Sequence, residues 1–227
     1  LDLDAIAAAA GLGDDPEALG RVLGQIQRVL ASSADDPVNW EIARDLARQV
    51  AAAGGDPSVS AAQQRAVAAA FSTAEVWLDA ATDLPAGGGP VRVWSRSEWV
   101  EQTLGRWRAL TEPIAGSVAD ALVGALRTQA PEALSSLGPA AEVGGQMMRQ
   151  LGSAVFGMQV GQATGTLARE VFGGTDIGLP LLDGPGVALV PRNVDEFAAG
   201  LDVPVDEVRI FLALREAAHA RLFTHVT

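Results

Sequence analysis

Cysteine is absent from this chain of 227 residues, and histidine is nearly so. Without cysteine there are no disulfides, no thiolate metal ligands and no cysteine nucleophile. The two histidines are His219 and His225, so a zinc site would need aspartate or glutamate to complete its ligands. These absences leave few residues from which metal chemistry could be built.

Lysine is also absent, and all sixteen basic residues are arginine. We interpret this as the coding bias of a GC-rich genome. The formal net charge of −12 repels phosphate backbones, so we expect no nucleic-acid partner. The chain has no G-x-S-x-G serine motif, and its three consecutive glycines lack the spacing of a phosphate loop. We expect a protein or peptide as partner, with a homo-oligomer left open.

The start of the chain lacks the basic region and apolar run of a secretory signal peptide. We therefore expect a cytoplasmic protein. The first residue is Leu1, not methionine, and a helical pattern continues to Thr227 without a capping signal. From this we expect a fragment of a longer protein, truncated at its C-terminus.

Apolar periodicity predicts a mostly α, multi-helix fold with at most one or two short strands. Alanine dominates the 48% hydrophobic share, which favours closely packed helices. We expect a single helical domain over residues 1–227, with residues 1–35 as a loosely attached helical arm. The predicted helices span residues 16–32, 37–53, 58–81, 96–128, 139–172 and 204–227. Residues 82–94 and 174–191 are predicted loops, and the sequence GVALV in the second is a predicted short strand.

Helix-start signals and one helix breaker set these boundaries. Aspartate precedes proline at 15–16, 36–37 and 56–57, which predicts a cap followed by the first helical residue. Ser95 and Glu98 have the spacing of a capping box. Pro113 is expected to kink or split the helix in which it lies.

Glycine recurs every fourth residue at Gly157, Gly161 and Gly165, within an apolar stretch. This spacing occurs in membrane helices, but Gln159 and Gln162 interrupt the stretch, and polar residues at mid-span are costly. We therefore predict a buried helix and no membrane span. Each glycine in a helix interior costs roughly 1 kcal/mol relative to alanine, so we expect a close backbone contact that offsets this cost.

Tryptophan and the second histidine are interpreted as structural. All five tryptophans fall in the first half of the chain, where we expect them to pack in the core or between helices instead of stacking on a ligand. They are Trp40, Trp77, Trp94, Trp99 and Trp107. His225 is expected to be exposed or to cap a helix.

The candidate site is the stretch from Arg215 to His219, which reads REAAH and is one residue away from the HExxH pattern of zinc peptidases. In that pattern two histidines four residues apart project from one helix face and bind zinc, and the glutamate acts as general base. Arginine stays protonated and has no free lone pair, so Arg215 cannot be a ligand. Taken alone, the local pattern favours an ordinary helix with i,i+4 side-chain pairs.

The surrounding sequence carries a wider resemblance. It rests first on two runs in the second half of the chain, GTDIGLPLL and VALVPRNVDEFAAGLDVPVDEVRIFLALREAAHARLFTHV. Three earlier runs also contribute to it: NWEIARDLARQVA, WSRSEWV and GSAVFGMQVGQATGTLA. Together they resemble a family of predicted zincin-like hydrolases found largely in actinobacteria, whose members are often named zinc-dependent metalloproteases. The shared signature is Val190-Pro191-Arg192-Asn193, followed by a helix with its motif core from Leu212 to Phe223.

The resemblance implies a zincin-like bundle and a role for each motif residue. Glu216 matches the catalytic glutamate and His219 the second zinc-binding histidine, whereas Arg215 stands at the first ligand position. The chain would therefore belong to a degenerate branch, and a third ligand would be expected beyond Thr227. Zinc is the cofactor of the family, and we expect none bound in this chain.

Two functions follow from this. The first is a zincin-like, metal-dependent and peptidase-like hydrolase scaffold whose zinc site is weak or inactive. The alternative is a non-catalytic helical protein for interaction or scaffolding. We also hypothesise that the guanidinium of Arg215 supplies the positive charge that zinc supplies elsewhere, by pairing with Glu216 or with an acidic group of another helix.

Overall fold

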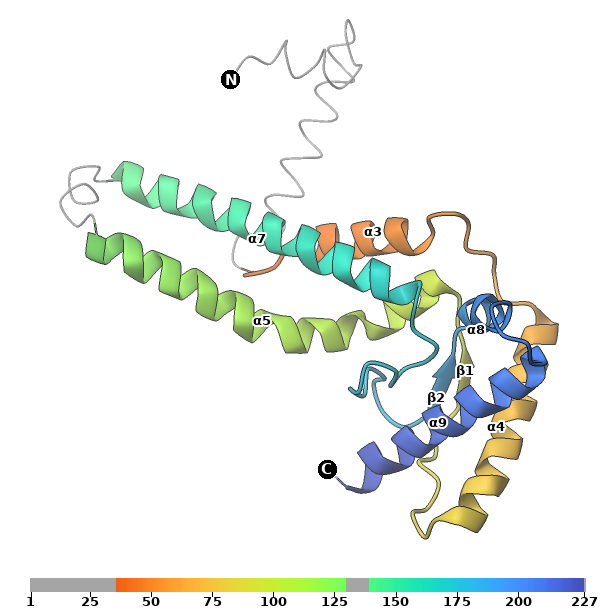
Figure 1. Ribbon diagram of the computed structural model, residues 1–227. Coiled ribbons are helices and arrows are strands. Elements are labelled where there is room, and N and C mark those ends of the chain that lie inside the picture. Colours follow the sequence, from red (N-terminus) through yellow and green to blue (C-terminus); the bar gives the residue numbers. More distant parts are fainter. Residues whose placement is uncertain (1–35, 130–138, 227) are drawn as a thin grey trace, which may run out of the picture. The chain divides into compact units, whose positions relative to one another are not determined.

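The computed structural model describes residues 36–129 and 139–226. The helices are α3 (Trp40–Ala51), α4 (Ala61–Ala81), α5 (Arg96–Gln129), α7 (Pro139–Ala168), α8 (Pro191–Ala198) and α9 (Val205–His225). The strands are β1 (Val91–Val93) and β2 (Val187–Leu189) (Figure 1). The mostly α fold with short strands is confirmed. The predicted helix at 16–32 and its Asp-Pro start lie outside the described residues.

The chain divides into two compact units. Unit 1 consists of residues 1–42 and 114–158, and unit 2 of residues 43–113 and 159–227. The boundary falls at Pro113, yet α5 continues through this proline as one helix. Pro113 therefore does not split the helix, because the hydrogen bond that the proline removes is one among many in a helix of 34 residues, and the kink stays a prediction. The single domain stays a prediction.

Two of the predicted helix starts are displaced by three or four residues. The Asp-Pro pairs at 36–37 and 56–57 lie ahead of α3 and α4 and do not cap them. The Oδ1 atom of Asn39 instead accepts the backbone N–H of Ile42 at 3.0 Å, and Ser60 and Gln63 form a capping box on α4. Proline fixes only its own dihedral, so a better side-chain cap further on sets the helix start.

Helix α5 has two caps at its N-terminus. The predicted box is confirmed: Ser95 N–H donates to Glu98 Oε2 at 2.7 Å, and Glu98 N–H donates to Ser95 Oγ at 3.2 Å. The carboxylate of Asp56 also accepts the N–H groups of Arg96 and Ser97, at 3.1 and 2.8 Å. Asp56 therefore caps a helix 40 residues further along the chain, which local sequence reading cannot detect.

The two strands form a small parallel sheet in unit 2, with Val91 opposite Val187 and Val93 opposite Leu189. The strand predicted in GVALV is confirmed, but the prediction of a loop throughout residues 82–94 is wrong, because Val91–Val93 is the other strand. The Val-Arg-Val alternation there is too short to stand out beside proline and three glycines. Helix α8 was not predicted.

The two faces of β2 contact different apolar clusters. Val187 and Leu189 pack with Phe71 of α4 and Leu212 of α9, whereas Ala188 on the opposite face packs with a second cluster. That second cluster includes Trp94, Trp99, Val100, Val171, Leu181 and Val190. Successive strand residues point to opposite faces, so burial on both sides requires the continuous apolar run that β2 has.

Tryptophan packing follows the expectation only in part. Trp94 and Trp99 are buried in the second cluster, and Trp107 packs against it. Trp77 is 54% exposed on α4, so the packing prediction is wrong there. His225 is exposed in the last turn of α9, as expected.

The glycines of α7 allow close approach to α3. In unit 2, a Cβ atom on Gly161 would lie 2.6 Å from the carbonyl oxygen of Ala43, and one on Gly165 would lie 2.7 Å from that of Ala47. In unit 1, Gly157 lies in the same way against Asn39. The predicted close backbone contact is confirmed, and the small residues of α3 repeat every fourth position as the glycines do. None of the described helices is long and apolar enough to cross a membrane.

Candidate functional site

Helix α9 carries the three motif residues. Its first turn holds Asp206 and Glu207, whose negative charges stabilise the N-terminal end of a helix. Glu216 points into unit 2 and is only 3% exposed. Arg215 and His219 are half-buried and lie one turn apart, on the shared face that their spacing predicts.

The carboxylate of Glu216 is enclosed by the turn that precedes β2. Its Oε1 atom accepts the N–H of Gly174 at 2.8 Å, and Oε2 accepts the N–H and the hydroxyl of Thr175 at 3.2 and 2.5 Å. A Cβ atom on Gly173 would lie 2.7 Å from Glu216 Cδ, so this approach requires glycine. Glu216 thus holds the 173–175 turn against α9.

Burial raises the pKa of Glu216, because the low-dielectric interior disfavours the charged carboxylate. The hydrogen bonds from Thr175 and Gly174 act in the opposite direction and offset only part of this effect. A general base needs a lone pair directed at the water that it deprotonates, and hydrogen bonds from the protein already occupy at least three of the about four lone-pair sites of the Glu216 carboxylate.

His219 joins the same network through Thr175. The Nδ1 atom of His219 lies 3.2 Å from the Thr175 hydroxyl oxygen. When that hydroxyl donates to an ionised Glu216, Nδ1 must donate to Thr175, which leaves the lone pair on Nε2. The ring also contacts Phe223 edge-on, with centroids 6.2 Å apart. One imidazole nitrogen therefore stays available on this face.

Arg215, which the resemblance aligns with the first zinc ligand, forms an ion pair with Asp176. Its guanidinium also lies over the ring of Phe172, 5.9 Å from the ring centroid. Asp176 accepts the N–H of Phe172 at 2.9 Å, so the pair is anchored to the backbone. The hypothesised partners, Glu216 or an acidic group of another helix, are wrong, because Asp176 belongs to the loop before β2.

The residues present do not fit zinc. Arg215 has no lone pair to give, Glu216 is engaged by three donors, and His219 offers one nitrogen. Among residues 36–129 and 139–226, no three His, Asp or Glu side chains gather as a metal site would require. Catalytic zinc normally takes three protein ligands. The expected absence of zinc from this chain nevertheless stays a prediction.

The Val-Pro-x-Asn signature has a structural role beside the site. Pro191 is the first residue of α8, where its missing N–H costs nothing. Asn193 is buried and its amide donates to the carbonyls of Ala168 and Val171 at 3.0 and 2.5 Å, at the C-terminal end of α7. Its Oδ1 accepts from Arg96 Nε at 2.7 Å. Asn193 thus satisfies helix-end carbonyls that would otherwise be buried without partners.

Sequence reasoning missed Thr175 and Asp176 as partners of the motif. Both lie in the quoted run GTDIG, which carried the resemblance without any assigned role. The pair of glycines just before them is a usable signal, since adjacent glycines permit a close approach of backbone to a side chain. The distance of about 40 residues along the chain to Glu216 concealed the contact.

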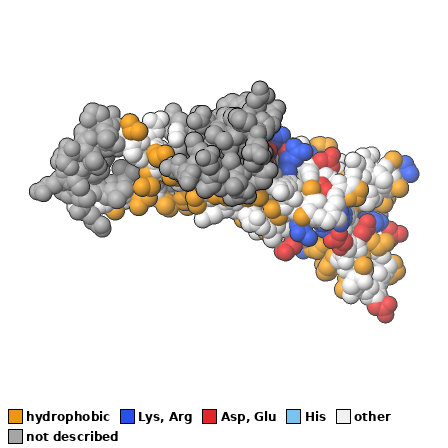
Figure 2. Space-filling view, turned by 90° about the horizontal axis from the view of Figure 1, so that it is seen from above, with side chains coloured by type: hydrophobic (Ala, Val, Ile, Leu, Met, Phe, Trp, Pro, Cys, Tyr) orange, Lys and Arg blue, Asp and Glu red, His pale blue; other side chains and the backbone are white. Residues whose placement is uncertain are grey.

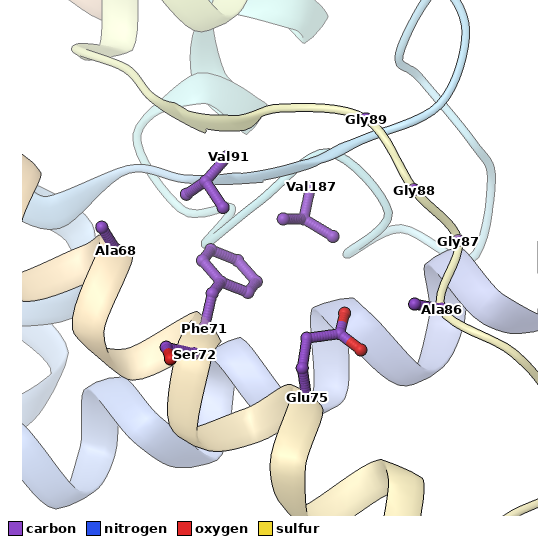
Figure 3. A pocket seen from close by; sticks show the side chains of 10 residues that line it. All are labelled: Ala68, Phe71, Ser72, Glu75, Ala86, Gly87, Gly88, Gly89, Val91 and Val187. Carbon is purple, nitrogen blue, oxygen red and sulfur yellow. The ribbon is translucent and has the colours of Figure 1, made fainter.

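A pocket of about 310 Å³ opens in unit 2 between α4, the 86–89 loop and the edge of the sheet. Figure 3 shows Phe71 and Glu75 extending from α4 toward Val187. The carboxylate of Glu75 forms an ion pair with the buried Arg221, which Asp79 also contacts at 2.6 Å. The motif residues do not line this pocket, so it is separate from the candidate site.

Fold and site together define a mostly helical protein with one short parallel sheet and a buried glutamate on α9. Residues 38–227 match the family of zincin-like metallopeptidases. This chain belongs to that family.

A crystal structure from Chloroflexus aurantiacus, of a "putative hydrolase with a novel fold", is similar to this chain with a TM-score of 0.59 and 21% sequence identity. The match covers 82% of this chain and 53% of that protein, so the chain spans about half the length of its structural relative. At this identity the likeness is one of fold. No curated protein matches the chain.

Proposed function

We propose that this chain is a metallopeptidase-like scaffold whose zinc site has been replaced by an ion pair, and that it acts by binding a protein or peptide without metal-dependent cleavage. The observation that carries the proposal is the ion pair of Arg215 with Asp176. It sets a fixed positive charge where the motif has its first ligand. The site is then complete without a metal.

The hydrogen bonds of Glu216 support this proposal. A catalytic glutamate in a zincin must reach the metal-bound water, but here both carboxylate oxygens accept hydrogen bonds from the 174–175 turn. The residue ties α9 to that turn, which is a structural task. The motif residues therefore keep their helical spacing, while the carboxylate of Glu216 serves to hold α9 and the 174–175 turn together.

The test is a calorimetric zinc titration of the chain beside its Arg215→His variant. We expect no stoichiometric uptake by the native chain, because His219 alone offers an available ligand. The variant places two imidazoles four residues apart on one face, so measurable uptake is expected. His219→Ala added to that variant should abolish it, and His225→Ala, at the exposed histidine, serves as the matched control.

Uptake of one zinc per native chain, lost in His219→Ala and kept in His225→Ala, would overturn the proposal. The site would then hold metal with ligands other than those named here. Peptide hydrolysis by the zinc-loaded chain would be the measurement to make next.

A further inference from the structure

The pocket of unit 2 that adjoins α4, called the α4 pocket from here on, has mostly apolar walls. Phe71, Val91 and Val187 supply its largest apolar side chains. Among the described residues that line it, Ser72 and Glu75 carry the polar side chains. Its volume of about 310 Å³ lies at the small end of ligand sites, which span roughly 300–1,000 Å³. The pocket therefore suits a small group or a single side chain.

Glu75 belongs to a cluster of charges that one arginine holds together. The buried Arg221 donates from Nη2 to Oε2 of Glu75 and to Oδ1 of Asp79, the second at 2.6 Å. One guanidinium cannot neutralise two carboxylates, so the cluster keeps a negative charge. The side chain of Glu75 is 34% exposed and lines the pocket, so this charge is within reach of a ligand. A cation is therefore favoured there.

The charge of the whole chain favours the same kind of ligand. The formal net charge is −12, and Figure 2 shows acidic side chains at several places on the face in view. A field of this sign steers cations toward a protein and raises their rate of association. A positively charged occupant thus suits both the pocket and its surroundings.

The hydrogen bonds of Glu75 favour an ammonium over a guanidinium as this cation. Arginine recognises a carboxylate best through two parallel hydrogen bonds, one to each oxygen. Oε2 of Glu75 already accepts from Arg221, which leaves Oε1 as the oxygen for a ligand. An ammonium is a compact point charge that needs only one such oxygen. The hydroxyl of Ser72, in the same lining, is a further acceptor for its remaining donors.

The apolar walls suit the stem of a lysine side chain. Figure 3 shows the ring of Phe71 and the carboxylate of Glu75 both extending from α4 toward Val187. Lysine lays its methylene stem along apolar surface while its charged end reaches a polar environment. The pocket presents these two environments side by side.

We propose that the α4 pocket binds a lysine side chain of the partner protein or peptide, with the ammonium at Glu75 and the stem against Phe71 and Val91. Residues 1–227 contain no lysine, so neither this chain nor a second copy of it supplies such a side chain. The choice of this occupant rests on the proposed function, because that function makes the partner a protein or peptide. It adds the side chain by which the partner is recognised.

A titration of the full chain with single-residue probes tests the pocket. The probe is Nα-acetyl-lysine methylamide, and NMR of isotope-labelled valine methyl groups detects its binding. Val91 and Val187 line the pocket, whereas Val76 is exposed on α4 outside the lining. We expect saturable shifts at the two lining valines at roughly millimolar probe, as is typical of a ligand of this size, and none at Val76.

Analogues of the probe test which group is recognised. The norleucine analogue lacks the ammonium and should bind about tenfold more weakly. The arginine analogue should bind about threefold more weakly, because its fork finds a single carboxylate oxygen. Equal binding of the norleucine analogue, or tighter binding of the arginine analogue, would overturn the proposal. Binding of n-butylammonium without binding of the lysine probe would also overturn it, in favour of a free amine as ligand.

Two matched variants test the role of Glu75. Glu75→Gln should weaken binding of the lysine probe about tenfold, because it removes the charge that contacts the ammonium. Asp79→Asn removes an equal charge from the other partner of Arg221, which lies outside the lining, and should weaken binding less than about threefold. Equal losses would show attraction to the cluster as a whole and would contradict a contact in the pocket.

A second pair of variants tests the space itself. Ala68 and Ala69 are neighbouring exposed residues on α4, and Ala68 lines the pocket. Ala68→Leu should abolish binding of the probe by filling the pocket, and Ala69→Leu should leave it unchanged. Alanine and leucine are both strong helix formers, so both variants should fold. Equal affinities in the two variants would contradict the proposal.

These outcomes are separate from the zinc titration, because the motif residues do not line the α4 pocket. Zinc uptake by a native chain that still binds the lysine probe would overturn the proposed function alone. A chain that binds neither zinc nor the lysine probe would overturn only the occupant named here.

Discussion

Arg215 and Asp176 form an ion pair that joins α9 to the loop before β2. The carboxylate of Asp176 also accepts the N–H of Phe172, over whose ring the guanidinium lies. The pair thus connects a charge on the motif helix with the backbone of the loop.

Removing the ion pair should destabilise the protein modestly. Arg215 is about one-third exposed, so solvent screens the charge pair, and we expect a coupling of about 0.5–1 kcal/mol. A double-mutant cycle of Arg215→Ala and Asp176→Ala in urea measures it. Asp176→Ala alone should cost more than Arg215→Ala, because it also leaves the N–H of Phe172 without its acceptor. Equal costs would contradict this assignment.

Helix α7 offers a matched pair of glycines. Gly161→Ala should destabilise by about 1–3 kcal/mol, because the added methyl group would lie 2.6 Å from the carbonyl oxygen of Ala43. Gly152→Ala, on the same helix with no neighbouring atom within 4 Å, should stabilise by about 0.5–1 kcal/mol. Thermal unfolding distinguishes the two. Similar shifts in Tm would argue against close packing at Gly161.

Arg221 should tolerate neither alanine nor lysine. It is 1% exposed and donates to the carbonyl of Leu84 at 2.8 Å while pairing with Glu75 and Asp79. Since its two carboxylate partners can return to water, we expect Arg221→Ala to cost about 2–3 kcal/mol. Lysine lacks the forked donors and should rescue less than half of that loss. Arg65→Ala, at an exposed arginine on α4, is the control and should be nearly neutral.

The pH dependence of stability should reveal the buried carboxylate. Because the pKa of Glu216 is raised above 4.5, the folded state binds more protons than the unfolded state once the pH exceeds that value. Native stability therefore falls as pH rises from about 4.5 through the folded pKa, and Glu216→Gln lacks this loss. Over this pH range the unfolding free energy of the native chain should fall relative to that of Glu216→Gln, by about 1.4 kcal/mol for each unit by which folding raises the pKa of Glu216.

Urea unfolding between acid and neutral pH measures this difference. Glu207→Gln, at an exposed carboxylate on the same helix, provides the control. If the difference in unfolding free energy between Glu216→Gln and the native chain stayed constant with pH, the carboxylate would be charged at little cost in the folded protein.

Local chemistry explains which features could be predicted. The capping box at Ser95 and Glu98 and the glycine spacing in α7 each depend on residues three or four positions apart, and both are present. Asp56 behaves differently, because its partners lie 40 residues away. Its role needed the fold to be known first.

In the candidate site, too, local features could be predicted from the sequence and long-range contacts could not. The motif placed Arg215 and His219 on one face of α9 correctly, since this follows from helical spacing alone. Neither Thr175 nor Asp176 could be assigned, because their contacts with α9 exist only once the loop has packed on it. Burial of Glu216 was equally invisible, although it determines the direction of its pKa shift.

The parallel pairing of β1 with β2 affects how the chain reaches this state. The paired residues lie about 100 positions apart, so the sheet can form only after a long loop has closed, at an entropic cost that grows slowly with loop length. Contacts of such high sequence separation slow folding. Both long helices lie between the strands and can form earlier from local contacts alone. The sheet, and with it the turn that encloses Glu216, is then among the last parts of the protein to be completed.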